Sequence, residues 1–329
     1  MAPTPSSPWS RRSVIGAGLG GAALLARPAL AQTYPTRPIR FVVGYAPGGT
    51  TDVLARLIAE PLGRRLGQQV LVENRPGAAN NIGTDAVVRA EPDGYTILLA
   101  NPANGINDSL YKKLNFNFQR DIAPVAAITR SPNIMEISPK LPVKSVAEFI
   151  AYCKANPDKV NMASSGVGTS VHMSGELFKA MTGVSMVHVP YRGAGPAITD
   201  LLAGNADVLF DNLPSSIGHV RGGSLRALGV TTAERAPALP DVPTVAETVP
   251  GYEASAWFGI GAPRKTPPEL IARLNREVNE VLADPAMAKK LADLGGAPLP
   301  LTPEAFGALI AQEVEKWRKV VAFSGATVD

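Results

Sequence analysis

The stretch FVVGYAPGGTTDVLARLI, Phe41–Ile58, decides the fold class of this chain. It starts as an apolar run typical of a buried strand, passes through the pair Gly48-Gly49, and ends with the apolar spacing of an amphipathic helix. Glycine lets the backbone at the end of the strand turn its N–H groups outward. The stretch therefore predicts a strand, an amide-rich turn and a helix. It leaves three uses for the turn: a phosphate cradle, a nucleophile turn or a clasp for a carboxylate.

The same unit recurs along the chain. Short apolar runs of strand character alternate with helical patterns, and these runs are Gln68–Asn74, Tyr95–Asn101, Val160–Ser164, Met186–Val189, Ala206–Phe210 and Leu225–Val230. Short apolar strands separated by helices predict mainly parallel sheets with helices on both faces, which is an α/β fold. From Pro267 onward the pattern is almost entirely helical, with proline at helix starts and glycine after helix ends.

This number of strands predicts two lobes. A single open sheet seldom holds so many strands, so we expect two sheets, each flanked by helices. The segment 131–251 reads as an inserted α/β unit, and the chain returns to the first unit at 252–263. Residues 32–130 plus 252–329 would then form lobe 1, and residues 131–251 would form lobe 2.

The first 31 residues resemble an export signal. They contain the adjacent pair Arg11-Arg12, an apolar run over Val14–Leu25 and the sequence Ala29-Leu30-Ala31. This pattern predicts a twin-arginine signal peptide that is cleaved near Ala31, and hence a periplasmic location. A G-x-G-x-x-G match at Gly16–Gly21 has no strand before it and no acid about 20 residues after it, which excludes a dinucleotide site.

Charge and cysteine content exclude several classes of function. The signal segment holds three arginines and no acid, so 29 of the 32 basic residues remain against 28 acidic ones and the net charge falls from +4 to +1. No cluster of Lys and Arg remains as a nucleic-acid footprint. The single Cys153 cannot form an internal disulfide, and the three histidines lack metal-binding spacing, so we expect no metal and no cofactor.

Two loops are candidates for a ligand site, because ligands of open parallel sheets bind beyond the carboxyl ends of the strands. The candidates in the first loop are Tyr45, Ala46, Gly48, Gly49, Thr50, Thr51 and Asp52, where a threonine can cap a helix that begins near Asp52. Those in the second are Ser164, Ser165, Gly166, Thr169, Ser170 and His172. Amides at helix N-termini attract anions, and no G-x-x-x-x-G-K-[ST] motif points to a nucleotide phosphate. We therefore expect one loop from each lobe to grip a dicarboxylate-sized anion, although each loop also fits an ordinary strand-to-helix turn.

A serine-type hydrolase is the alternative. Ser164 or Ser165, together with His172 and Asp211, supplies the residue types of a catalytic triad, with Ser165 and His172 as nucleophile and base. The nucleophile elbow G-x-S-x-G is missing, however. Tyr191-Arg192 and Asp211 also follow strands: Arg192 fits a carboxylate partner or a solvated loop, and Asp211 fits ligand contact or a helix cap.

Six motifs resemble, in order, those of the tripartite tricarboxylate transporter substrate receptors, also called Bug receptors. They are APGGTTDVLAR, VENRPGAANNIGTDAV, PDGYTILLAN, SSGVGTSVHMSGELF, VPYRGAGPAITDLLAGNADVLFDN and LRALGVTTAERAPALPDVPTVAE. The resemblance covers Tyr34 to the C-terminus. It implies a two-lobed periplasmic-binding-protein fold of type II, whose α/β lobes are joined by crossing strands and close on a small organic acid. It also implies a monomer that delivers its ligand to a membrane transporter or a signalling partner.

The resemblance also implies where the ligand binds. In the family a carboxylate is commonly held by amides and hydroxyls of two facing loops, which here are Ala46–Thr51 and Ser164–His172, flanked by Tyr191-Arg192 and Asp211. The chain has Ala79-Asn80 where the family often has Gly-Gly, and Gly44 where it often has Pro. The sequence leaves the ligand open among dicarboxylates, aromatic acids and amino acids. A non-catalytic receptor for a mono- or dicarboxylate is the leading hypothesis.

Overall fold

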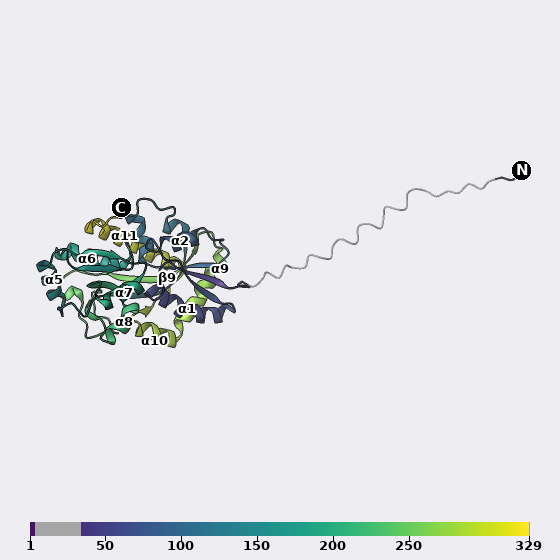
Figure 1. Ribbon diagram of the computed structural model, residues 1–329. Helices are drawn as coiled ribbons and strands as arrows, with labels where there is room; N and C mark the ends of the chain where they lie inside the picture. Colours follow the sequence, from purple (N-terminus) through teal and green to yellow (C-terminus); the bar gives the residue numbers. More distant parts are fainter. Residues whose placement is uncertain (4–33, 329) are drawn as a thin grey trace.

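The computed structural model describes residues 1–3 and 34–328 (Figure 1). The predicted signal peptide and the Gly16–Gly21 match lie outside the described residues. In Figure 1, α5 and α6 lie at one end of the molecule and α1, α2 and α9 at the other, with strand β9 between them. Within the described part of the chain, no helix is both long and apolar enough to cross a membrane.

Three parallel strands form one end of the sheet. They are β1 (Ile39–Val43), β2 (Val70–Asn74) and β3 (Thr96–Ala100), with β1 in the middle. Their connections carry the helices α1 (Thr50–Leu66), α2 (Asn81–Val88), α3 (Pro102–Leu110) and α4 (Phe118–Asp121). The predicted strand–turn–helix order of this region is confirmed.

One long strand, β4 (Ile122–Ile137), joins two sheets. Its first part, Ile122–Pro132, pairs antiparallel with β9 (Ser255–Pro263), which also pairs with β3. Its second part, from Asn133 onward, pairs antiparallel with β7 (Val208–Asn212) and with β8 (Arg226–Val230). Along the main path of pairing the strand order is β2-β1-β3-β9-β4-β7-β5-β6, and β8 and the short strand β10 (Ala297–Pro298) pair with β4 off this path. We call the part built on β1, β2, β3 and β9 the first half and the part built on β5 to β8 the second half.

The second half repeats the α/β pattern. Strand β5 (Asn161–Ser164) runs parallel to β6 (Val187–Pro190) and to β7. The helices of this half are α5 (Val146–Ala155), α6 (Ser170–Thr182), α7 (Ala194–Ala203) and α8 (Leu213–Arg221), followed by the short 3₁₀ helix η1 (Val245–Glu247). The C-terminal part holds α9 (Pro268–Ala283), α10 (Pro285–Asp293), the two-residue strand β10 (Ala297–Pro298) and α11 (Pro303–Ser324). The expected α/β fold, with two mainly parallel sheets flanked by helices, is confirmed.

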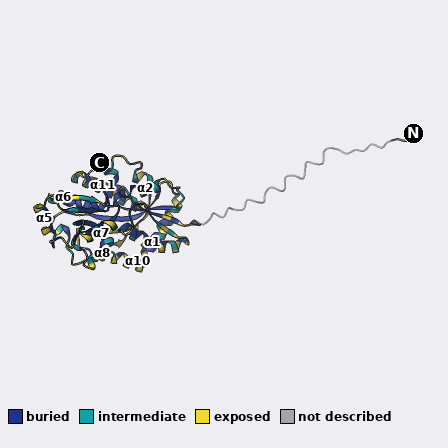
Figure 2. Cartoon of the chain, viewed as in Figure 1, coloured by how far each residue is buried: buried dark blue, intermediate teal, exposed yellow. Residues whose placement is uncertain are grey.

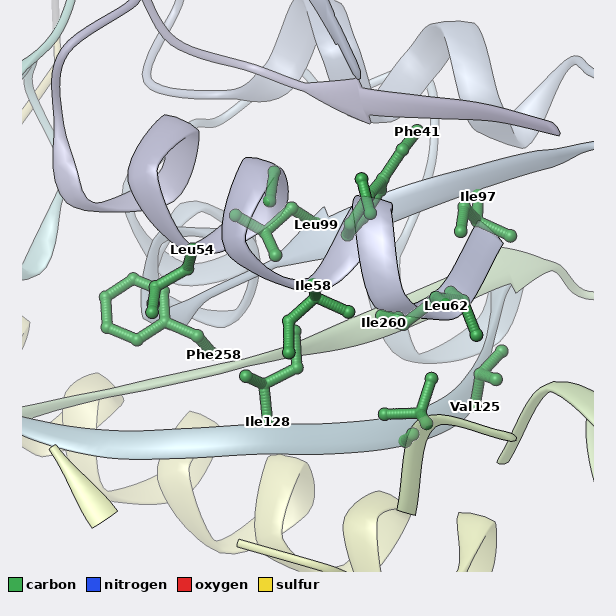
Figure 3. Close-up of a cluster of buried hydrophobic side chains, with 14 of the residues drawn as sticks. Phe41, Leu54, Ile58, Leu62, Ile97, Leu99, Val125, Ile128, Phe258 and Ile260 are labelled. Carbon is green, nitrogen blue, oxygen red and sulfur yellow. The ribbon is translucent and has the colours of Figure 1, made fainter. Parts of the chain in front are cut away.

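The largest apolar core lies under α1. Leu54, Ile58 and Leu62 follow one another at every fourth position and are buried against residues of the sheet such as Phe41 and Ile260 (Figure 3). Figure 2 shows the same division over the whole molecule, with buried residues along the strands and exposed ones on the outer helix faces. Burial of this one helical stripe fixes the position of the α1 N-terminus at the strand ends.

Helix α1 begins earlier than the sequence predicted. Its first residue is Thr50, and the residue before it, Gly49, occupies the N-cap position without a side-chain hydrogen bond. The expectation that Thr50 or Thr51 caps a helix starting near Asp52 is therefore wrong. The hydroxyl of Thr50 instead contacts Ser215 of α8, at 2.9 Å between the two oxygen atoms.

Helix α11 packs on both halves. Trp317 and Val321 of α11 lie in one apolar cluster with Leu110 of α3 and Met173 of α6. The sequence predicted this helix as part of lobe 1 alone, because its periodicity does not reveal that the apolar face is long enough to cover a helix from each half.

Replacing Trp317 with alanine is expected to lower the free energy of unfolding by about 3–5 kcal/mol, because it leaves a large cavity where the two halves meet α11. The indole is 1% exposed. Urea denaturation measures the effect. Phe323→Ala on the same helix is the control: this ring is 63% exposed, and its loss should change the free energy by less than about 0.5 kcal/mol. Equal effects of the two changes would contradict the packing described.

Candidate anion-binding cleft

Five helices direct their N-termini at one small pocket between the two halves. Its lining includes N-cap or first-turn residues of α1, α3, α6, α7 and α8. The lining residues are Tyr45, Gly49, Thr50, Thr51, Asn101, Ser165, Thr169, Ser170, Ala194, Asn212 and Phe258. Of these described residues none is charged. Because each helix N-terminus carries a partial positive charge and free N–H groups, the pocket favours an anion without any cationic side chain.

The N-terminus of α1 offers amides that no side chain caps. The first backbone hydrogen bond of this helix runs from Val53 N–H to the Gly49 carbonyl, so the amides before Val53 have no acceptor within the helix. Gly49 supplies no side-chain cap. An oxyanion in the pocket would accept hydrogen bonds from these amides.

Asp52 stabilises the loop before α1 through hydrogen bonds on the side away from the pocket. Its carboxylate accepts hydrogen bonds from Gly48 N–H at 3.1 Å and from the Asn74 amide at 3.0 Å, and it forms an ion pair with Arg56 at 2.9 Å. Burial by itself raises the pKa of Asp52, but the hydrogen bonds from Arg56, Gly48 and Asn74 outweigh it, and the pKa is lowered. The sequence placed Asp52 among the ligand-binding residues, whereas the structure places it outside the pocket lining as a support of the loop.

Asn101 is a lining residue that the sequence analysis missed. Its side-chain oxygen accepts hydrogen bonds from Ala103 N–H at 3.0 Å and from the Tyr45 hydroxyl at 3.3 Å. Its amide nitrogen Nδ2 is buried and has no partner. A buried donor without an acceptor costs free energy, so this group suits a ligand oxygen. The sequence could have indicated Asn101 as a candidate, because this residue follows a strand as the two candidate loops do.

Ser165, Thr169 and Ser170 line the pocket from the second half. Thr169 caps α6 by accepting a hydrogen bond from His172 N–H, and the hydroxyl of Ser170 accepts one from the Asn212 amide at 3.2 Å. Ser164 is fully buried beside them and supports the loop by accepting a hydrogen bond from Gly166 N–H at 3.2 Å. Asn212, like Ala194 and Phe258, is a lining residue that the sequence analysis did not name.

The two residues of the hydrolase alternative do not meet. His172 Nδ1 accepts a hydrogen bond from Gly168 N–H, and its ring stacks on His188 at 3.9 Å, so it lies outside the pocket lining. The buried serine–histidine pair near the loop joins Ser164 to His188 Nε2 at 2.6 Å. Burial, reinforced by the neighbouring His172, lowers the pKa of His188 to about 3. The Ser164 hydroxyl of this pair is fully buried and lies outside the pocket lining.

A second, larger pocket adjoins the first and shares Tyr45 and Ser165 with it. Its free space is about 180 Å³, against about 20 Å³ in the first pocket, which is room for about one water molecule. Its other lining residues are Gly44, Gly77, Ala78, Ala79, Tyr111, Gly166, Val167, Pro190, Tyr191 and Arg192. Besides the shared Tyr45 and Ser165, three further predicted residues thus line this adjoining pocket: Gly166, Tyr191 and Arg192.

The two departures from the family pattern, at Gly44 and at Ala79-Asn80, are in direct contact. A Cβ atom on Gly44 would lie 1.7 Å from Oδ1 of Asn80. The larger side chain at position 80 is therefore matched by the absence of one at position 44.

Contacts between the halves surround the pocket. The Ala46 N–H donates to the Arg192 carbonyl at 3.0 Å, and Thr50 contacts Ser215. A Cβ on Gly49 would lie 3.2 Å from Cβ of Ala194. The structure thus describes the site with the halves closed on it, and Ala46 acts at their contact rather than in the pocket.

Gly48 and Asp211, two further predicted residues, also lie outside both linings. Gly48 is exposed on the loop, where its N–H is bound to Asp52. Asp211 is fully buried behind the pocket wall and accepts hydrogen bonds from the hydroxyls of Ser215 and Ser216. The expected ligand contact of Asp211 is replaced by a contact with the helix that follows it.

The chain is similar to known proteins over most of its length. Residues 54–325 match the model of the tripartite tricarboxylate transporter family receptor. Protein BugT of Bordetella pertussis is 39% identical over 317 residues, which covers 95% of this chain and 97% of BugT.

Solved structures show the same fold. Rpa4515 of R. palustris with adipate has a TM-score of 0.87 and 39% identity, over 90% of this chain and 100% of that chain. MatC (Rpa3494) from Rhodopseudomonas palustris with bound malate has a TM-score of 0.84 and 33% identity, over 88% of this chain and 100% of that chain. These similarities confirm the two-lobed fold expected from the sequence.

Proposed function

Because this chain belongs to the tripartite tricarboxylate transporter receptor family, a family of periplasmic solute-binding receptors, we propose that it binds a small mono- or dicarboxylate between its halves and delivers it to a membrane transporter or a signalling partner. One observation carries the proposal: five helix N-termini and an unpaired Asn101 amide converge on one uncharged pocket. Such an arrangement binds an anion through amide dipoles and hydroxyls.

The ligand class is a short carboxylic acid. Two relatives of similar length are complexes with adipate and with malate, both linear dicarboxylates. The first pocket is too small for either acid, but it shares Tyr45 and Ser165 with the adjoining, larger pocket. One carboxylate would sit at the helix N-termini, and the rest of the acid would extend toward Arg192. A few charge-assisted hydrogen bonds of about 1.5–3 kcal/mol each give micromolar affinity or better.

Binding would proceed by closure of two lobes, residues 32–130 plus 252–329 and residues 131–251. The change of partners along β4, from β9 up to Pro132 to β7 from Asn133, supports a boundary there. Closure removes water from the anion and brings the amides of both loops onto it. We also propose that the protein is exported by its twin-arginine signal, is cleaved near Ala31, and acts in the periplasm as a monomer without turnover.

Thermal unfolding with adipate and with malate tests the proposal. A ligand present at one hundred times its Kd should stabilise the protein by about 2.7 kcal/mol and so raise its Tm, while a panel of esters should show no hydrolysis. If neither acid raises the Tm, a library of organic acids is tested in the same way. If no acid in the library raises the Tm, carboxylate binding is refuted. Ester turnover that disappears in Ser165→Ala would favour the hydrolase instead.

A further inference from the structure

Two carboxyl groups that the proposed function does not use lie together behind the pocket wall. Glu136 on β4 and Asp211 on β7 are both 0% exposed. The register pairs Ile134 with Asp211, so Glu136, two residues further along β4, lies diagonally beside Asp211 on the same face of the sheet. Two ionised carboxylates in such a place would repel each other without water to screen them.

The Ser216 hydroxyl lies between the two carboxyl groups, and its single hydrogen fits a pair that holds one proton. The Ser216 hydroxyl oxygen lies 2.7 Å from Oε1 of Glu136 and 2.9 Å from Oδ2 of Asp211. A hydroxyl has one hydrogen and can donate to one of these oxygens only. The other contact is a hydrogen bond only if that carboxyl is protonated and donates to Ser216.

Asp211 is the ionised member. Its Oδ2 atom also accepts the hydroxyl of Ser215, and an acceptor of two hydroxyl hydrogens suits a carboxylate. Glu136 is then the carboxylic acid. Burial, followed by the charge of Asp211, raises the pKa of Glu136 well above its usual range, and burial raises the pKa of Asp211 to about 6 despite its hydrogen bonds.

A hydrogen-bond chain leads from this pair to the ligand pocket. The Ser215 hydroxyl, which donates to Asp211, lies 2.9 Å from the hydroxyl of Thr50, and the Ser215 N–H donates to the same Thr50 oxygen at 3.2 Å. Thr50 belongs to the first half and lines the pocket, whereas Ser215 belongs to the second half. The chain therefore crosses the contact by which the halves close.

We propose that Glu136 and Asp211 are positioning residues: their shared proton directs the Ser215 hydroxyl at Asp211 and leaves its lone pair for Thr50, so that closure over the ligand weakens when Asp211 takes up a proton of its own. This inference rests on the proposed function for the role of closure, but its readout needs no ligand.

The pH window follows from the raised pKa of Asp211. The carboxylate is ionised above about pH 6 and neutral below it, so the closing contact is strongest at neutral pH and weakens as the pH falls through that value. A protonated Asp211 donates its own hydrogen to the Ser215 oxygen, where it competes with Thr50. The Ser215 hydrogen then turns to the Asn212 carbonyl, 2.9 Å from the Ser215 oxygen, which is also the other acceptor of the Thr50 hydroxyl, so both contacts of Thr50 are weakened.

Other charged groups on the surrounding elements have partners elsewhere. On β4, Arg130 pairs with Glu313 of α11, and on α1, Asp52 pairs with Arg56. On α6, Glu176 pairs with Lys179 and His172, on β6 His188 contacts Ser164, and on α7 Asp200 accepts from Tyr191. On α8, His219 contacts Ser224 and Arg221 donates to the Ala238 carbonyl, and on β8 Arg226 donates to the Val143 carbonyl. Among the described residues, Glu136 is the titratable group that shares a hydroxyl with Asp211.

The test measures closure directly in the ligand-free protein. Spin labels on Glu91→Cys and Lys159→Cys, two exposed positions in different halves, report the distance between the halves, and the native Cys153 is buried. Between about pH 7.5 and about pH 5, the ratio of closed to open molecules should fall roughly threefold to tenfold, which corresponds to one weakened hydrogen bond. A distance distribution that does not change with pH would overturn the proposal.

Three variants separate a positioning role from a structural one. Asp211→Asn should show the low-pH distribution at every pH, because its side chain is always neutral, and Ser215→Ala should also lose the pH dependence. Glu136→Gln is the matched control: its amide donates to Ser216 as the protonated acid does, so the wild-type pH profile should remain. A flat profile in Glu136→Gln would contradict the assignment of the proton.

Infrared spectroscopy gives an independent measure of the proton. At neutral pH, the wild type should show the carbonyl stretch of a protonated carboxylic acid, and Glu136→Gln should lack it. Absence of this band from the wild type would refute the shared proton. Because none of these readouts uses an organic acid, a failure to bind adipate or malate would count against the proposed function and leave this inference standing.

Discussion

Gly49→Leu is expected to lower the affinity for whichever organic acid stabilises the wild type by more than about hundredfold. Gly49 is buried at the contact between the halves, and even a Cβ atom there would lie 3.2 Å from Cβ of Ala194. A leucine side chain would hold the halves apart, so the ligand would lose the hydrogen bonds of one loop. Two charge-assisted bonds of about 1.5–3 kcal/mol each account for an effect of this size.

The Gly49 variant should otherwise fold normally. Its φ of −86° is accessible to any residue, so the substitution strains no backbone, and the Tm of the ligand-free protein should change little. Gly218→Leu is the matched control, because Gly218 is exposed and a Cβ atom added there meets nothing within 4 Å. Isothermal titration calorimetry measures both variants. Wild-type affinity in Gly49→Leu would mean that the ligand does not bind between these loops.

Asn101→Asp is expected to reduce the affinity by about hundredfold or more at neutral pH. The substitution keeps the oxygen that caps α3 and accepts from Tyr45, but it replaces the unpaired buried Nδ2 donor with a second oxygen. The ligand would lose a donor worth about 1.5–3 kcal/mol and face a negative charge in a pocket shielded from water.

Asn101→Ser separates these two causes. Serine also caps helices, and it removes the amide without adding a charge, so its affinity should fall by roughly tenfold only. Calorimetry at neutral pH compares the two variants, and circular dichroism confirms that α3 remains folded. If Asn101→Asp bound the acid as tightly as the wild type, the Nδ2 group would not face the ligand.

Local patterns in the sequence were enough for the secondary structure and for the two loops. The apolar run at Phe41, the glycine pair at Gly48-Gly49 and the helical spacing after them predict β1, the turn and α1, because each depends on residues close together in the chain. The same reasoning located Ser165 and Thr169 after β5. Those loops supply seven of the lining residues of the first pocket: Tyr45, Gly49, Thr50, Thr51, Ser165, Thr169 and Ser170.

The tertiary structure alone decided which of these groups face the ligand. Thr50 and Ser215 are 165 positions apart, and only the order of strands across β4 and β9 brings them within hydrogen-bond distance. The same order turns His172 toward His188 and Asp211 toward Ser216, away from the pocket. The type of a side chain and its distance from a strand end are local properties, whereas the direction in which it points depends on packing between distant segments.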